Sequence, residues 1–261
     1  CKWLIDNNVG LAVFGTNSEA NSMSTREKLR LLDALAASGL PTQRMMPGTG
    51  ACALDDSVEL TKRAVELGCG GVLMLPPFYY KGVPEEGLYR NFSEIIQRVG
   101  DDRLRIYLYH IPPVAQVGIP LGLIERLLKD YPGIVAGAKD SSGDWSNTKA
   151  MIDNFAAQGF DVYPGSESFL LQAMRAGGAG CISATANVNP GPIAKLAATW
   201  QDDDADAQQE GLNVTRGIFQ TYVMIPALKA AFAHYGRDPE WNRLRPPLVD
   251  LTADELKDLL A

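Results

Sequence analysis

The chain has 261 residues, of which 46% are hydrophobic and 21% charged, and its formal net charge is −7. This length fits one large α/β domain or two small ones, with a core of ordinary size. The acidic balance argues against a nucleic-acid partner, and no apolar run approaches the ~20 residues that a membrane span needs.

The cysteine pattern indicates free thiols. Cys1, Cys52, Cys69 and Cys181 form no CxxC pair and have no histidine-rich neighbourhood. Such spacing argues against both a disulfide framework and a zinc site. The cysteine pattern therefore predicts no bound metal. No secretory signal is visible, so we expect a cytoplasmic protein.

The predicted elements alternate between short apolar strands and amphipathic helices. Gly10–Gly15 is the first strand, and Ser24 begins a helix that runs to about residue 38, with Glu27 at the capping-box position. A later helix is expected to have Pro84 at its first position, because acidic residues follow it. The other strands are predicted over residues 43–48, 71–75, 105–109, 134–139, 160–163 and 180–184, and the other helices over residues 55–67, 121–129, 168–175 and from residue 146.

This alternation defines the fold class. Seven strand–helix units follow one another at intervals of roughly 25–35 residues, which means parallel strands with right-handed crossovers. The architecture is therefore an open doubly wound sheet or a closed (β/α)8 TIM barrel. No GxGxxG motif opens the first unit, so the dinucleotide-binding open sheet has no support.

The two ends of the chain differ from this pattern. Residues 1–6 are typical of the middle of a helix, so we expect the first strand of the barrel to be missing from this chain. After Asn187 the pattern becomes purely helical. We therefore expect a (β/α)8 barrel without its N-terminal strand over residues 1–189, and a C-terminal helical layer over residues 190–261.

The chemistry is expected at the carboxyl ends of the strands, where barrel active sites lie. With only two histidines and no clustered acidic ligands, neither a Ser-His-Asp triad nor a metal centre is indicated. The residues at these ends are mainly hydroxyl-bearing, together with one lysine: Thr16, Thr49, Tyr79, Tyr80, Tyr109, Lys139, Ser166, Glu167, Ser183, Thr185 and Asn187.

Lys139 has two interpretations. It follows directly after the apolar run Ile134–Ala138. In the first interpretation it is a surface lysine whose aliphatic stem packs along the strand, and in the second it is a nucleophile. A free lysine titrates near ~10.4, and burial beside the apolar run would favour the reactive neutral amine. Tyr109 ends the preceding strand and could move protons, although alone it could equally be a core tyrosine.

Four motifs resemble those of the pyruvate-dependent class I aldolase family that contains dihydrodipicolinate synthase and N-acetylneuraminate lyase. The resemblance extends from Gly15 into the helical tail. Gly15-Thr16-Asn17-Ser18-Glu19 is similar to the family's GTTGE loop, and Phe78-Tyr79-Tyr80 with residues 86–89 to its tyrosine loop and helix. Tyr109-His110-Ile111-Pro112 is similar to its Y-N-x-P motif, and residues 137–144 to its Schiff-base motif.

The resemblance implies catalytic roles. Lys139 would form a Schiff base with pyruvate or another 2-oxo acid, and Tyr109 would donate and accept protons. Thr16 would link Tyr109 to Tyr80 in a relay, with Tyr80 reaching the mouth of a neighbouring subunit. A homodimer or homotetramer without a cofactor is implied.

The resemblance also implies binding residues. The backbone of the Thr16-Asn17 turn would hold the pyruvate carboxylate, and Gly165 and Ile182 would line the pocket. Three departures matter: Asn17 replaces a second threonine, Ser18 replaces a glycine, and residues 113–116 contain no arginine for the carboxylate of the synthase's second substrate. These departures favour a sibling of the synthase.

The sequence therefore predicts a Schiff-base-forming lyase, an aldolase or dehydratase, that uses pyruvate or a related 2-oxo acid with an aldehyde or a sugar acid. One alternative is 4-hydroxy-tetrahydrodipicolinate (dihydrodipicolinate) synthase, which condenses pyruvate with aspartate semialdehyde. Another is a non-catalytic 2-oxo-acid sensor, although a binder needs no proton relay. A third is an unrelated barrel such as a phosphate-binding isomerase, for which residues 164–166 and 177–180 offer only a weak glycine-rich loop.

Overall fold

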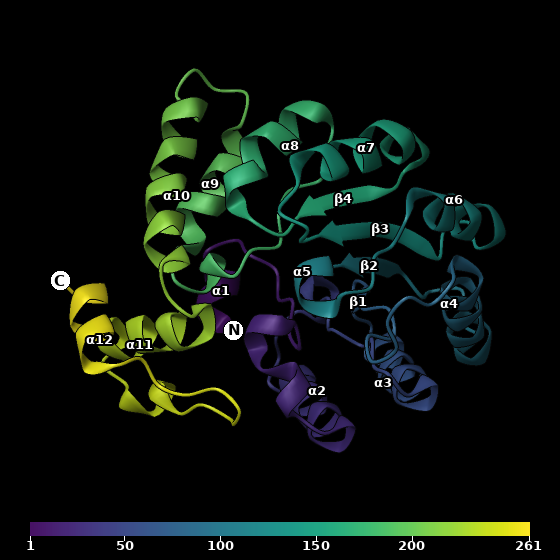
Figure 1. Ribbon diagram of the computed structural model, residues 1–261, viewed down its shortest axis with the longest axis horizontal. Coiled ribbons are helices and arrows are strands. Elements are labelled where there is room, and N and C mark those ends of the chain that lie inside the picture. Colours follow the sequence, from purple (N-terminus) through teal and green to yellow (C-terminus); the bar gives the residue numbers. More distant parts are fainter.

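A parallel sheet forms the centre of the molecule. The computed structural model describes residues 1–261. Strands β1 (Val72–Met74), β2 (Ile106–His110), β3 (Val135–Asp140) and β4 (Asp161–Pro164) pair in this order, all parallel, and helices pack outside them (Figure 1). This arrangement confirms the predicted α/β class, because parallel neighbours require crossover helices.

Three further predicted strands are present only as extended segments. Leu11 bridges to Met45, Gly48 bridges to Leu73, and the Ile182 N–H donates to the Pro164 carbonyl at 3.0 Å, so these segments continue the parallel order on both sides of the sheet. The prediction of regular strands over residues 10–15, 43–48 and 180–184 is wrong. Glycine and proline residues in these segments, such as Pro47 and Gly180 (φ +135°), explain why the hydrogen bonding of regular strands is interrupted.

The predicted barrel helices form close to their expected limits. The Ser24–Glu27 capping box is present, since the Glu27 N–H donates to Ser24 Oγ at 3.3 Å and the Ser24 N–H donates to Glu27 Oε2 at 2.9 Å. Pro84 is the N-cap of its helix, one position earlier than expected. The helices around the sheet are α2 (Thr25–Ala37), α3 (Leu54–Glu66), α4 (Glu85–Val99), α6 (Leu121–Asp130), α7 (Trp145–Phe155) and α8 (Leu170–Ala176), with short helices α1 (Lys2–Asp6) and α5 (Pro112–Ala115).

The C-terminal part is helical, as predicted. It consists of α9 (Pro190–Thr199), α10 (Ala205–Gln220), α11 (Met224–Gly236) and α12 (Ala253–Leu259). Buried Leu170 and Leu171 of α8 pack with Ile193 and Leu196 of α9 and Leu212 of α10. This apolar contact attaches the helical layer to the barrel on the side toward which β3 and β4 point in Figure 1. The boundary between residues 189 and 190 stays a prediction.

Two glycines make room for a large side chain inside the sheet. A Cβ atom on Gly137 would lie 2.7 Å from Cδ1 of Tyr107 and 2.3 Å from the carbonyl oxygen of Asp161. A Cβ atom on Gly71 would lie 2.6 Å from the other edge of the Tyr107 ring. Because alternate residues of a strand share one face, Tyr107 and Gly137 form the layer directly below Tyr109 and Lys139.

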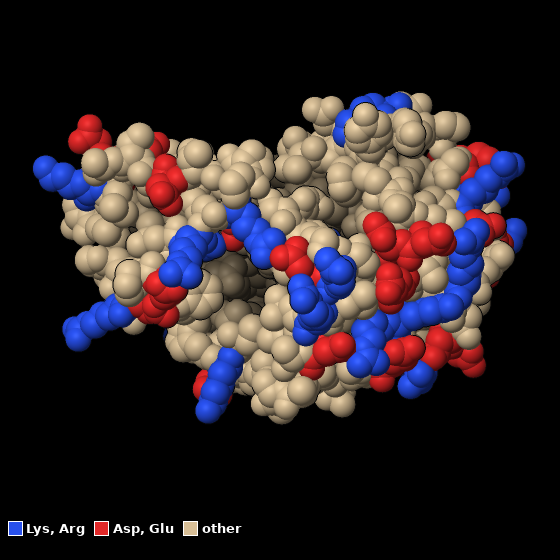
Figure 2. Space-filling model, turned by 90° about the horizontal axis from the view of Figure 1, so that it is seen from below, with Lys and Arg blue, Asp and Glu red and all other residues tan.

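The surface carries interleaved charges of both signs. Figure 2 shows lysine and arginine side chains beside acidic ones over most of the face in view, which is hollowed near its centre. Exposed pairs such as Arg63–Asp33 and Arg98–Glu94 each contribute about 0–1 kcal/mol to stability. None of the helices is long and apolar enough to cross a membrane.

Candidate active site

A buried lysine and a buried tyrosine form the centre of the candidate site. Lys139 and Tyr109 are direct partners in the β2–β3 register, and their exposed fractions are 6% and 2%. Lys139 Nζ donates a hydrogen bond to the phenol oxygen at 3.2 Å and lies 4.3 Å from the centroid of the tyrosine ring. No carboxylate lies within ion-pair distance of Nζ, so hydrogen bonding to the phenol is the main polar contact of this amine.

Thr16 completes a chain of three polar groups. It begins the short helical turn Thr16–Ser18, and its Oγ1 lies 3.1 Å from the phenol oxygen of Tyr109. The phenol thus contacts an amine on one side and a hydroxyl on the other. The structure brings together Lys139, Tyr109 and Thr16, which lie on three separate segments of the sequence.

A cavity of about 570 Å³ opens beside Lys139. Asn17 and Ile182, both predicted to bind substrate, are among its lining residues. It extends between segments 10–13 and 181–184, which no backbone hydrogen bond joins, so part of this volume is the gap between the first and last segments of the barrel. Gly165 is not part of the lining. It packs against Ser141, whose Oγ would lie 2.0 Å from a Cβ atom at that position.

Tyr80 lies apart from the other predicted catalytic residues. Its exposed fraction is 72%, and its ring packs edge-on against Tyr79 with the centroids 5.3 Å apart. It makes no hydrogen bond to Thr16 within this chain. Because the expected relay uses Tyr80 of a neighbouring subunit, that role stays a prediction.

The turn that holds Thr16 is fastened to the C-terminal part of the chain. Glu19 adopts a left-handed conformation (φ +54°) and accepts hydrogen bonds from Lys229 Nζ at 2.7 Å and from the Arg245 N–H at 2.8 Å. Burial alone would raise the pKa of Glu19, but these two donors outweigh it and hold the pKa below its ordinary value. The Arg245 side chain also reaches Ser22 and Glu27.

Two polar residues after Tyr109 and Lys139 fix the loops that follow. His110 Nδ1 accepts a hydrogen bond from the Ile119 N–H at 2.9 Å, which closes the loop between β2 and α6. Burial lowers the pKa of His110, and the Asp140 carboxylate offsets part of this effect. Asp140 accepts hydrogen bonds from Asn147 Nδ2 at 2.9 Å and Thr148 Oγ1 at 2.7 Å, which anchors the start of α7.

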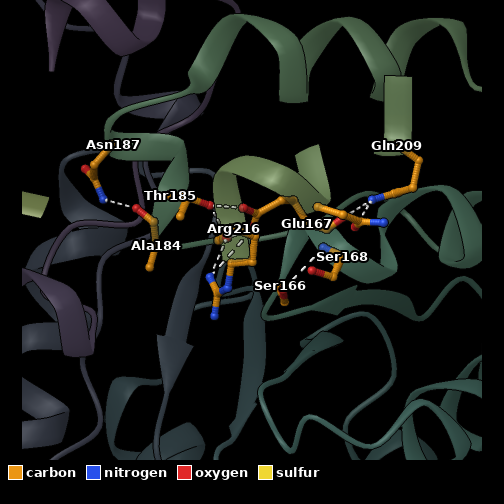
Figure 3. A network of polar contacts seen from close by, with 10 residues as sticks. Ser166, Glu167, Ser168, Ala184, Thr185, Asn187, Gln209 and Arg216 are labelled. Carbon is orange, nitrogen blue, oxygen red and sulfur yellow. Dashed lines mark hydrogen bonds and ion pairs between the residues drawn. The ribbon is translucent and has the colours of Figure 1, made fainter. Parts of the chain in front are cut away.

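A second polar network lies at the same end of the sheet and was not predicted as a unit. Glu167 is fully buried, and the hydroxyls of Ser183 and Thr185 donate to its two carboxylate oxygens. Arg216 of α10 places Nη1 3.6 Å from Glu167 Oε2 and 3.4 Å from Ser183 Oγ (Figure 3). The strand-end pattern contained Glu167, Ser183 and Thr185, but nothing in the sequence distinguishes Arg216 from other arginines of the helical tail.

The fold and this geometry define a barrel enzyme of the lyase class. The chain matches the Dihydrodipicolinate synthetase family over residues 2–261 and belongs to that family. It is 35% identical to a DapA-like lyase of Chloroflexus aurantiacus, over 97% of this chain and 83% of the relative. It is 34% identical to a 4-hydroxy-tetrahydrodipicolinate synthase of Thermus thermophilus, over 94% of this chain and 81% of the relative.

Solved structures agree with the assignment of the fold. The crystal structure of dihydrodipicolinate synthase from Agrobacterium tumefaciens superimposes with a TM-score of 0.89 at 28% identity, over 99% of this chain and 88% of the other. A monomeric dihydrodipicolinate synthase variant superimposes with a TM-score of 0.80 at 26% identity, over 99% of this chain and 87% of the other. The predicted TIM-barrel class is confirmed.

Proposed function

We propose that this protein is a Schiff-base-forming lyase, an aldolase or dehydratase, that acts on pyruvate or a related 2-oxo acid through Lys139. The single observation that carries the proposal is the buried amine of Lys139 hydrogen-bonded to the phenol of Tyr109, which in turn contacts Thr16. An amine nucleophile needs a partner that can deliver and remove protons, and the phenol is within reach.

The first half of the reaction forms the covalent intermediate. The lone pair of neutral Lys139 Nζ attacks the C2 carbonyl carbon, and the carbonyl oxygen takes a proton to give a carbinolamine. A second proton, delivered through Tyr109, lets this oxygen leave as water while nitrogen loses its own proton, which gives an iminium ion. Tyr109 regains a proton through Thr16.

The second half makes or breaks a bond next to the iminium. Loss of a proton from C3 gives an enamine, whose C3 attacks the carbonyl carbon of an aldehyde while the aldehyde oxygen takes a proton. Water then adds to C2 and releases Lys139, and the reverse sequence is aldol cleavage. In a dehydratase, the enamine instead expels the C4 hydroxyl, which takes a proton and leaves as water.

The turn at Thr16 supports a site for the carboxylate of the 2-oxo acid. The backbone N–H groups of Thr16 and Asn17, which begin a helical turn, and the Asn17 amide are donors beside the cavity. Ile182 supplies an apolar part of the cavity lining. We place the reaction in the cytoplasm, which the four free cysteines support, and in a homodimer or homotetramer that light scattering can test.

Synthesis of 4-hydroxy-tetrahydrodipicolinate is the second candidate function. The names of relatives 30–34% identical to this chain favour it. The absence of a cation from residues 113–116 argues against it, because the second substrate of that reaction carries a carboxylate. Turnover of pyruvate with aspartate semialdehyde, measured beside a panel of other aldehydes, decides between the two functions.

Borohydride trapping tests the covalent step. We expect reduction in the presence of pyruvate to add one pyruvate-derived group to Lys139, located by peptide mass spectrometry. Lys28 is the matched control, because its side chain is also buried and burial lowers its pKa, yet it makes no contact with the Tyr109 phenol. Unmodified Lys139 at saturating pyruvate, or equal labelling of Lys28, would overturn the proposal.

A further inference from the structure

Lys28 is a buried lysine that lies outside the contact of Lys139 with Tyr109. It belongs to α2, its exposed fraction is 7%, and its Nζ makes no hydrogen bond or ion pair with another residue. Burial lowers the pKa of this amine, and the Asp56 carboxylate in the first turn of α3 offsets part of the effect. Lysines are almost never buried without a partner, so Nζ has donors available for a polar molecule beside it.

A small cavity lies between Lys28 and the phenol of Tyr109. Its volume is about 10 Å³, and its lining includes Lys28, Thr16 and Tyr109. This volume is roughly the 10–15 Å³ that one water molecule needs, and a buried water needs about two to four polar partners. The amine, the threonine hydroxyl and the phenol supply these partners, so the cavity fits one water between Lys28 Nζ and Thr16 Oγ1.

The other walls of this cavity are mainly apolar. Phe14, Ala20 and Leu73 are buried residues of the lining, and Asn21 is its one exposed member. The polar groups therefore face one another in surroundings of low dielectric constant, where hydrogen bonds between them are stronger than in water. Solvent is closest at Asn21, which gives the cavity an edge where protons can enter.

Thr16 needs a proton donor if it is to resupply Tyr109. Its Oγ1 makes one hydrogen bond within the chain, and that bond is with the phenol. Water alone is a weak acid with a pKa of ~15.7, whereas a lysine ammonium ordinarily titrates near ~10.4. Burial brings the pKa of Lys28 closer to neutral pH, and a general acid works best when its pKa lies near the operating pH. Lys28 is therefore a much stronger proton source than water.

We propose that Lys28 supplies protons to Tyr109 through one water molecule and Thr16. This inference rests on the proposed function, because the supply serves the Schiff base on Lys139. The ammonium gives a proton to the water, the water gives one to Thr16 Oγ1, and Thr16 gives its own to the Tyr109 oxygen. Neutral Lys28 then takes up a proton from solvent. Lys28 touches no reacting atom, so it is a positioning residue, and this supply operates within one chain.

Hydrogen exchange at C3 of pyruvate measures the relay without an aldehyde. Each passage through the iminium and the enamine in D2O replaces a C3 hydrogen by deuterium, which NMR follows at saturating pyruvate. Lys28→Met should lower the exchange rate about 3- to 10-fold, as Thr16→Val does, with little change in KM. In the Thr16→Val background, Lys28→Met should cost less than about 2-fold more, because coupled residues are not additive.

Lys28→Arg separates proton supply from charge. The guanidinium keeps the charge but does not release its proton, since its pKa lies above ~12. The exchange rate should therefore fall as in Lys28→Met, whereas arginine would rescue a role that needs only the charge. This variant decides the question if Lys28→Met fails to fold. Lys62→Met removes an exposed lysine from the neighbouring helix α3 and should leave the exchange rate unchanged.

The outcomes separate this inference from the proposed function. If borohydride labels Lys139 in every variant, exchange falls in both Lys28 variants, and the loss disappears in the Thr16→Val background, the proton supply is established. If Lys28→Arg exchanges at the wild-type rate, or the losses from Lys28→Met and Thr16→Val multiply, the supply is wrong while the Schiff-base mechanism stands. If wild type gives no adduct with pyruvate, both proposals fall.

Discussion

The phenol oxygen of Tyr109 lies 3.2 Å from Lys139 Nζ and 3.1 Å from Thr16 Oγ1. One hydroxyl therefore connects the amine on β3 with the turn that precedes α2. The phenol can donate a proton to only one neighbour at a time, so a proton that leaves toward the substrate can be replaced from Thr16. Substitution of Tyr109 and of Thr16 tests the two contacts of this hydroxyl separately.

Tyr109→Phe removes the hydroxyl and keeps the buried ring. We expect kcat to fall about 100- to 10,000-fold, the usual contribution of general acid–base catalysis. The circular dichroism spectrum should stay unchanged, because the ring still packs beside Ile111 and Ala115. Borohydride trapping should still label Lys139, but more slowly. A Tyr109→Phe enzyme with the wild-type rate would remove the phenol from the mechanism.

Thr16→Val replaces the hydroxyl with a methyl group of similar size. The phenol then has no second hydrogen-bond partner, and we expect kcat to fall about 3- to 10-fold. Thr16→Ser restores the hydroxyl and is the matched control, with kcat close to that of wild type. A loss in Thr16→Ser with a wild-type kcat in Thr16→Val would show that the threonine methyl, rather than its hydroxyl, is what the site needs.

Glu19→Gln should weaken binding of the 2-oxo acid more than turnover. The glutamate holds the Thr16–Ser18 turn through Lys229 and Arg245, and loss of its charge loosens that turn. We expect KM for pyruvate to rise about 3- to 10-fold with a smaller change in kcat. Glu240→Gln removes an exposed ion pair from the same C-terminal segment and should leave KM unchanged. Steady-state kinetics measures both variants.

His110 should make folding stability depend on pH. Because burial lowers its pKa in the native state, the unfolded chain takes up the proton more readily. The stability is complete above the ordinary histidine pKa of about 6.5, and it is lost as the pH falls through the lower native value. Protonation of Nδ1 would also oppose the Ile119 N–H, which donates to it.

Urea unfolding between about pH 7.5 and 5.5 measures this effect. The free energy of unfolding should fall more steeply in wild type than in His110→Asn, which removes the titrating ring. His234→Asn is the control, because His234 is exposed. Parallel pH profiles for wild type and His110→Asn would show that His110 does not cause the dependence.

Gly137→Ala should destabilise the fold by about 3 kcal/mol. The added methyl group would overlap the Tyr107 ring and the Asp161 carbonyl, and overpacking of this kind is costly. Gly87→Ala is the contrasting variant. Gly87 lies in the first turn of α4, where a Cβ atom meets only Pro84 at 3.9 Å, so stability should rise by about 0.5 kcal/mol. Urea unfolding compares the two substitutions.

Much of the fold followed from local sequence signals. Capping residues such as Ser24 and Asp144 are local, so the helices lie close to their predicted limits. The segments around Met45 and Ile182 were expected as regular strands, but glycines and prolines interrupt their hydrogen bonding, and apolar pattern alone does not report on such breaks. A local sequence pattern also does not show which strands pair across long sequence separations.

In the candidate site, too, residues with a local sequence signal were predicted and residues placed by long-range contacts were not. Lys139, Tyr109 and Thr16 each follow a predicted strand, and the resemblance to the aldolase family implies their joint role. The β2–β3 register places Lys139 beside Tyr109, and the turn Thr16–Ser18 brings Thr16 to the phenol. Arg216 was not predicted, because its contact with Glu167 spans 49 positions of sequence and begins in an ordinary amphipathic helix. The exposure of Tyr80 depends on the packing of its loop, which the two tyrosines alone do not determine.

The hydrogen bonds that join Glu19 to the C-terminal part of the chain have a consequence for the order of folding. Its partners Lys229 and Arg245 are 210 and 226 positions away, so these contacts join nearly opposite ends of the chain. Contacts of such high sequence separation form late, because a long loop must close first. During synthesis on the ribosome, Lys139 and Tyr109 are made before Lys229 and Arg245, so they can come into contact before the turn at Thr16 is fixed. Full affinity for the 2-oxo acid should therefore arise only when Lys229 and Arg245 are in place, and a protease that cuts between α11 and Arg245 should raise KM while leaving the contact of Lys139 with Tyr109 intact.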